Sequence, residues 1–128
     1  MVVVADKYRG KKIYHIIYSE LITAARYRGT VTYQEIARLM GLPLSGNYMG
    51  LEVGHILGEI SEDEHAQGHP MLSAVAVGVS GEPGEGFYIL ACELKKFNDD
   101  SAEAKKRFWQ REKAEVYKTW KKVLHTEE

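Results

Sequence analysis

Histidine and carboxylate residues recur at helical spacing in the middle of the chain. His55, Glu59 and Glu62 are four and three residues apart, so a helix would place them on one face. His65 lies three residues beyond Glu62, and with His69 it offers a second set. Histidine nitrogens and carboxylate oxygens bind zinc and similar divalent ions. One hypothesis is therefore a small metal-dependent hydrolase that uses His55, Glu59, Glu62 and His65, and the alternative is a solvated acidic helix end.

Two further features resemble catalytic elements but have simpler explanations. Ser73 lacks a surrounding Gly-x-Ser-x-Gly pattern and has no histidine placed beside it by sequence, which favours a structural serine. The glycine-rich segment 81–86 lacks the lysine of a phosphate-binding loop and carries Glu82 and Glu85, which favours a turn. The sequence therefore identifies no catalytic residue and implies no cofactor.

Cationic and aromatic residues are interleaved in the first third of the chain. Arg26, Arg28 and Arg38 occur there together with Tyr33 and several other tyrosines. Cations neutralise phosphates, and aromatic rings stack on bases, so such a set is typical of nucleic-acid binding. We predict that these four residues contact DNA or RNA, and the alternative is that the tyrosines only pack in the core and at its rim.

Charge is segregated along the chain although the formal net charge is only -1. Residues 1–43 carry a charge of +4, residues 44–94 carry -8 with no lysine or arginine, and residues 95–128 carry +3. A polyanion is expected to meet the basic flanks first, because phosphate binding needs Lys and Arg. This reading requires that the flanks converge in space while the acidic middle faces elsewhere; the alternative is that the flanks are ordinary solvated helix faces.

The apolar periodicity predicts the elements that must position these residues. Helices are expected over 11–27, 32–40, 48–67, 87–94 and 101–124, with a strand over 71–79 and a turn-rich loop over 80–86. Thr32 and Glu35 form a capping-box pattern at the start of the second helix. Gly50, Gly54 and Gly58 recur every four residues in the third helix, which indicates a closely packed backbone or an irregular helix.

This element order predicts an α+β fold with a winged helix-turn-helix core. A helix-turn-helix followed by a β wing is the plan of a winged helix. We expect one domain over 1–128, in which 29–86 form the winged-helix core and 87–128 form a C-terminal helical extension.

The segment Thr32–Ala37, followed by Gly41–Pro43 and then Pro70, resembles a known family. It is similar to the C-terminal winged-helix domain of the DNA alkyltransferases and alkyltransferase-like proteins, over about residues 29–86. The resemblance implies binding of duplex DNA through the minor groove, with the target base flipped out. It places Tyr33 at the position of the tyrosine that helps to rotate the phosphate of the target nucleotide.

The chain departs from this family at the reactive motif and on the recognition helix. Met71, Leu72 and Ser73 stand where the family has Cys-His-Arg, and a thioether cannot replace the thiolate that accepts the alkyl group. The family's base-displacing arginine falls at Asn47, or at Leu51 if a short insertion is allowed. The resemblance therefore implies DNA binding without alkyl transfer.

The composition sets the class of protein. A chain of 128 residues that is 45% hydrophobic can bury a core, and its single cysteine excludes an internal disulfide. The sequence has no apolar run of membrane-spanning length, and its start lacks the layout of a signal peptide. We therefore expect a cytoplasmic protein with no membrane contact.

The leading functional expectation is a non-catalytic nucleic-acid-binding or regulatory module. Its predicted contacts are Arg26, Arg28, Tyr33, Arg38 and Asn47. The alternative is a protein–protein adaptor that forms a homodimer or docks through the C-terminal helix, which carries Trp109 and Trp120. The metal-dependent hydrolase remains a third hypothesis.

Overall fold

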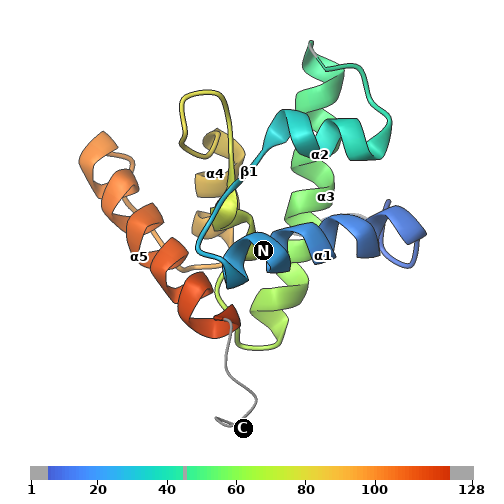
Figure 1. Ribbon diagram of the computed structural model, residues 1–128. Helices are drawn as coiled ribbons and strands as arrows, with labels where there is room; N and C mark the ends of the chain where they lie inside the picture. The colour runs from blue at the N-terminus through green and yellow to red at the C-terminus, as the bar shows by residue number, and fades with distance from the viewer. Residues whose placement is uncertain (1–5, 45, 122–128) are drawn as a thin grey trace, which may run out of the picture.

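A computed structural model describes residues 6–44 and 46–121 as an α+β arrangement, mostly helical with one small sheet (Figure 1). In chain order the elements are α1 (Lys12–Arg26), β1 (Val31–Thr32), α2 (Tyr33–Met40), α3 (Asn47–Ala66), the 3-10 helix η1 (Leu72–Val75), β2 (Ala76–Val77), α4 (Glu85–Glu93) and α5 (Ala102–Trp120). Within these residues, none of the helices combines the length and the apolar character that a membrane crossing requires.

The start of α2 confirms the predicted capping box. The Thr32 hydroxyl accepts the backbone N–H of Glu35 at 3.1 Å, and the Glu35 carboxylate accepts the backbone N–H of Thr32 at 2.9 Å. Gly41 ends the helix with φ +76°, a left-handed conformation that glycine adopts without steric strain. Both ends of this short helix are therefore specified by local sequence.

The strand predicted over 71–79 is wrong for most of its length. Leu72–Val75 form η1, and only Ala76 and Val77 pair as β2, in parallel with β1, with Val31 opposite Ala76. Residues 71–77 are all buried, so the segment is enclosed on every side. A continuous apolar run of this kind does not have the alternation of a half-exposed hairpin strand. Within the described ranges, the two strands form no antiparallel hairpin.

The helices predicted after this segment are present. α4 begins at Glu85, two residues before the predicted start at Phe87, and α5 begins beside the predicted Ser101, which caps it through a hydrogen bond to the N–H of Ala104. The predicted end of the last helix, Leu124, lies outside the described residues.

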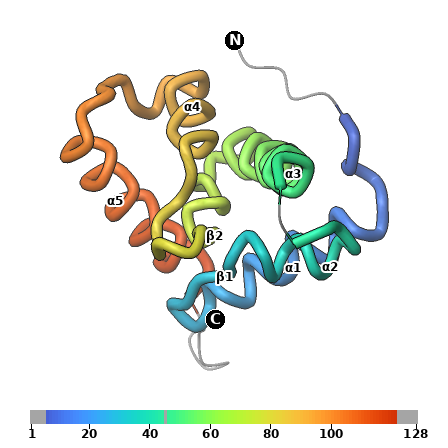
Figure 2. The backbone as a smooth tube through the Cα atoms, turned by 90° about the horizontal axis from the view of Figure 1, so that it is seen from above, coloured from blue at the N-terminus to red at the C-terminus, as the bar shows by residue number. Residues whose placement is uncertain are grey.

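η1 forms the centre of the core, and α1, α3 and α5 pack against it. Seen from above, α3 is viewed nearly end-on, with α4 on one side of it and the α1–α2 pair on another, while α1 also packs directly against α5 (Figure 2). The Trp109 indole N–H donates to the carbonyl of Ala74 in η1 at 2.8 Å, and Phe108 and Val116 are also buried. The apolar face of α5 was expected to serve either the core or a dimer, and in the described part of the chain Trp109, Phe108 and Val116 serve the core.

Candidate nucleic-acid interface

The acidic face of α3 is turned toward the N-terminal segment. The Glu59 carboxylate is fully buried and accepts three successive backbone N–H groups, those of Lys7 at 3.2 Å, Tyr8 at 3.1 Å and Arg9 at 2.8 Å. A buried carboxylate is tolerated when such donors replace the water that it has lost. Glu59 therefore fixes the segment before α1 onto α3.

Arg9 extends this contact along α3. Its guanidinium donates to Glu62 at 2.9 Å, to Asp63 at 3.1 Å and to the backbone carbonyl of Glu59 at 3.1 Å, and it also reaches Asp6 at 2.5 Å. A planar guanidinium with five donors can satisfy several acceptors at once. The positive charge of Arg9 is therefore compensated inside the protein.

Tyrosine hydroxyls and Lys7 occupy most of the remaining acceptors on α3. Three hydroxyls donate to carboxylates of α3: Tyr8 to Glu52, Tyr14 to Asp63 and Tyr18 to Glu64. The Lys7 ammonium donates to Glu52 at 2.8 Å and, together with the Tyr8 hydroxyl, holds the pKa of Glu52 below its ordinary value. The first tyrosines of the chain thus support the fold.

The predicted metal set is not assembled. His55 Nε2 lies 3.2 Å from the Glu59 carboxylate, but Glu59 and Glu62 are occupied by the segment 7–9, and His65 is exposed. Among the described residues, no group of three or more His, Cys, Asp or Glu side chains is arranged to hold a metal ion. The residues do lie on one helix as the spacing predicted, but the carboxylates of Glu59 and Glu62 accept hydrogen bonds from the distant segment 7–9.

The structure separates the predicted nucleic-acid contacts into two groups. α2 runs back along α1 in both views (Figures 1 and 2). Arg26 and Arg28 lie at the C-terminal end of α1, whereas Arg38 lies in the last turn of α2 and Asn47 begins α3 at the opposite end of the pair. The three arginines are exposed, but they do not form one cluster.

Tyr33 lies between these groups and fixes a loop. Its hydroxyl accepts the backbone N–H of Gly84 at 2.7 Å, and a Cβ built on Gly78 or Gly84 would lie 3.6 to 3.7 Å from its ring. Burial raises the pKa of the Tyr33 phenol. Its ring also lines a hollow of about 230 Å³ between α3 and α4. The side chain thus combines a structural contact with a place at the surface.

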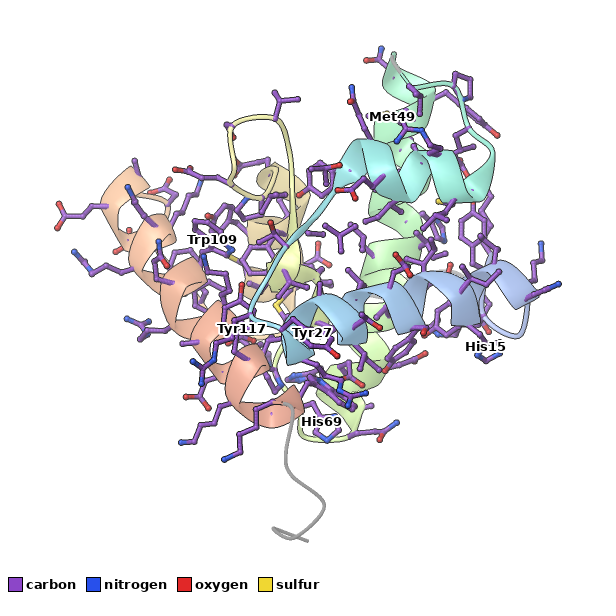
Figure 3. All side chains as sticks on the ribbon, viewed as in Figure 1. His15, Tyr27, Met49, His69, Trp109 and Tyr117 are labelled. Carbon is purple, nitrogen blue, oxygen red and sulfur yellow. The ribbon has the colours of Figure 1, made fainter. Side chains whose placement is uncertain are left out.

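The cations at the end of α1 lie beside the end of α5. The Tyr117 hydroxyl donates to the backbone carbonyl of Gly29 at 2.9 Å, which joins the two helix ends (Figure 3). Arg26, Arg28, Lys118 and Lys121 are exposed at this junction, which we call the basic corner. Tyr27, 64% exposed, belongs to the same junction. The sequence analysis required the two basic flanks to converge, but it did not identify the helix ends, because nothing in the local pattern indicates which of them meet.

Arg28 occupies an unusual backbone position in the basic corner. Its φ is +57°, a left-handed conformation usually taken by glycine. The N–H of Arg28 donates to Ala25 at 3.1 Å and that of Gly29 to Ala24 at 2.8 Å, the two bonds of a Schellman motif that ends α1. Position 28 is therefore an exposed arginine in a backbone conformation that glycine would adopt with less strain.

The position of the family's reactive cysteine is inside the core. Met71 is fully buried, and its backbone N–H donates to the Glu112 carboxylate at 2.8 Å. Ser73 is buried and accepts a hydrogen bond from the Ser61 hydroxyl at 2.7 Å. Both residues therefore have structural contacts.

The chain matches no protein-family model, no curated protein and no solved structure.

Proposed function

We propose that the chain is a non-catalytic nucleic-acid-binding or regulatory module of winged-helix type, and that the basic corner contacts the phosphate backbone. The observation that supports the proposal is the hydrogen bond from Tyr117 to Gly29, which joins the end of α1 to the end of α5. Arg26 and Arg28 near the first end, and Lys118 and Lys121 near the second, are all exposed. Each cation that neutralises a phosphate releases condensed counterions, which is the main source of sequence-independent affinity.

Some of the other cations are already paired within the protein. Lys7 and Arg9 are bound to α3, Lys96 lies 3.1 Å from Glu112, and Lys105 lies 2.7 Å from Glu85. In the described ranges, the four cations of the basic corner form no ion pair within 4 Å, and the same holds for Lys11, Lys12 and Arg38. Cations without internal partners keep their full charge for a polyanion.

The winged-helix part of the proposal rests on different residues. It is supported by the resemblance of Thr32–Ala37 to the alkyltransferase family and by the contact between α2 and α3. We propose that Arg38 and Asn47, at the far end of the α1–α2 pair, form a second, weaker contact, together with Tyr33 at the start of α2. Of these three residues, Arg38 alone carries a positive charge, so this contact is expected to contribute less to affinity than the basic corner.

The test is a fluorescence anisotropy titration of a labelled single strand and a duplex, each of roughly 20 nucleotides or base pairs, from about 50 to 200 mM salt. The R26Q/R28Q double variant is expected to bind at least about tenfold more weakly than the parent at low salt. The slope of log affinity against log salt on the duplex should fall by about 2.

The matched control is R107Q/R111Q, which removes two exposed arginines from the middle of α5. This control should keep an affinity close to that of the parent chain. If the parent chain binds neither strand form at low salt, the proposed function is wrong. If both double variants lose affinity equally, binding is a general charge effect and the basic corner is not the interface.

A further inference from the structure

α4 presents a short exposed line between two hollows. Glu85, Ile89 and Glu93 follow one another at intervals of four residues, and all three are exposed. The opposite side of the helix is buried in the core through Phe87, Tyr88, Leu90 and Ala91. Ile89 is 53% exposed although it is large and apolar. We call Glu85, Ile89, Glu93 and the hollows on either side of them the α4 face.

The two hollows make the α4 face a ridge with apolar flanks. One hollow, of about 480 Å³, is bounded by α4, the segment 97–100 and Lys105. The other, of about 230 Å³, lies between α4 and α3, with Leu57 and Phe87 in its wall. Ile89 lines both hollows. An apolar ridge between two grooves is suited to receive apolar side chains on either side of it.

The charges of the α4 face have one predominant sign. Its acidic residues are Glu85, Glu93, Asp99 and Asp100. Lys105 is the lysine that lines the larger hollow, and it is bound to Glu85 at 2.7 Å. The helices α3 and α4 also belong to a segment, 46–94, that carries no lysine or arginine. A partner on this face therefore gains by being basic, and a nucleic acid is repelled from it.

The wall formed by α3 leaves room for another backbone. Gly50 and Gly54 have no atom within 4 Å of an added Cβ, and the same holds for Gly86 on α4. The glycine spacing was taken to indicate either a closely packed backbone or an irregular helix. Within the described chain no backbone packs against Gly50 or Gly54, and α3 is one continuous helix. Glycine permits close approach of a second backbone. Gly54 and Gly86 line the smaller hollow, and Gly50 lines another hollow that also includes these two glycines.

We propose that the α4 face binds a basic amphipathic helix of a partner protein. The apolar residues of that helix would enter the two hollows around Ile89, and its Lys or Arg residues would lie against Glu93, Asp99 and Asp100. α4 has 9 residues, so a partner segment of about three helical turns matches its length. This surface is separate from the basic corner and goes beyond nucleic-acid binding.

The probe is a fluorescent synthetic helix of about 18 residues, made of leucine and lysine in an amphipathic pattern. Its matched control is the same peptide with glutamate in place of lysine. The full chain should bind the Leu/Lys peptide saturably by fluorescence anisotropy, and the Leu/Glu peptide at least about tenfold more weakly. Equal binding of the two peptides would overturn the proposal.

Two variants locate the contact on the α4 face. I89E places a charge on the exposed ridge and should weaken binding of the Leu/Lys peptide by at least about tenfold. The matched control is I16E, because Ile16 is also exposed but lies on α1. I16E should bind like the parent chain. Equal losses in both variants, or none in I89E while the far-ultraviolet circular dichroism of the folded chain is retained, would contradict the proposal.

Cys92 gives an independent measure of position. It is the single cysteine of the chain, it is exposed, and it lines the larger hollow. Saturating Leu/Lys peptide is expected to slow its alkylation by iodoacetamide at least about fivefold, because the bound helix covers the hollow. An unchanged alkylation rate at saturating peptide would place the peptide elsewhere and overturn the assignment.

Discussion

Residues of the N-terminal segment satisfy carboxylates that would otherwise be buried without partners. Glu59 shows this most clearly, since three consecutive N–H groups from 7–9 converge on one fully buried side chain. The acceptors lie on α3 and the donors precede α1, about fifty positions away in sequence. The hydrogen bonds to Glu59 therefore hold the segment 7–9 against α3.

Replacing Glu59 with glutamine tests the contact. The amide NH2 would face a backbone N–H and could not accept from it, so we expect the free energy of unfolding to fall by about 3 kcal/mol. Urea denaturation measures the change. The control is E20Q, an exposed position on α1, which should stay within about 0.5 kcal/mol of the parent. Similar values for the two variants would contradict the described role of Glu59.

Glu52 gives a pH dependence of defined sign. Its pKa is lowered in the folded protein from the ordinary value of 4.5, first by the hydrogen bond from Lys7 and then by that from Tyr8. A lowered carboxyl pKa contributes stability above the unfolded value, and this is lost as the pH falls through the folded value. The stability difference between the parent and E52Q should be constant above about pH 5.5 and shrink below pH 4.5. A difference independent of pH from 7 to 3 would contradict this origin.

Arg28 combines strain with display at the surface. Substitution by glycine should raise the free energy of unfolding by about 0.5 to 1 kcal/mol, because relief of the left-handed conformation outweighs the added freedom of the unfolded chain. R26G, inside the last turn of α1, should instead lower it by about 1 kcal/mol. Thermal or urea unfolding measures both. A loss of stability in R28G would show that the arginine side chain supports the fold.

At the scale of elements, Gly54 of α3 affects the stability of the isolated chain through helix propensity. An added Cβ at Gly54 meets no atom within 4 Å, and Gly54 lies inside a continuous helix of 20 residues. Gly54 therefore lowers the stability of α3 relative to alanine at the same position. No packing contact in the described chain requires glycine at position 54, so the open space beside it can admit a partner at the surface.

G54A is expected to raise the free energy of unfolding by about 1 kcal/mol, the difference in helix propensity between alanine and glycine. The contrasting variant is G68A, which also meets no atom within 4 Å but has a φ of +79°. G68A should lower the free energy of unfolding by about 1 kcal/mol through backbone strain. Urea denaturation of both proteins measures the pair, and a destabilised G54A would indicate packing against that glycine.

Elements with local signals could be predicted from the sequence, and the central segment could not. The capping box at Thr32 and Glu35 fixes the start of α2, and apolar periodicity gives the five helices. The strand prediction for residues 71–77 was wrong because this segment is enclosed by α1, α3 and α5 at once. An apolar run buried on all sides carries no periodicity, so β-branched residues such as Val75 and Val77 suggested a strand.

At the scale of the whole molecule, the basic N-terminal segment folds onto the acidic helix α3, so that charges separated along the sequence form ion pairs. Lys7 and Arg9 bind carboxylates of α3, which the linear sequence had placed in a separate block. The prediction that the acidic middle faces away from both basic flanks is wrong for these residues. The arginines at 26 and 28 remain exposed, but their association with α5 depends on a tertiary contact that sequence periodicity does not encode.

We propose that polyanions bind at the basic corner and that basic partners bind at the α4 face, which is a separate surface. The most direct measurement is a titration of the nitrogen-15-labelled chain with a short DNA duplex, followed by backbone amide chemical shifts. Changes are expected at residues 26–29 and 117–121, saturating with added duplex and reversed by salt. Shifts confined to α3 and α4, or no shifts at low salt, would contradict the account.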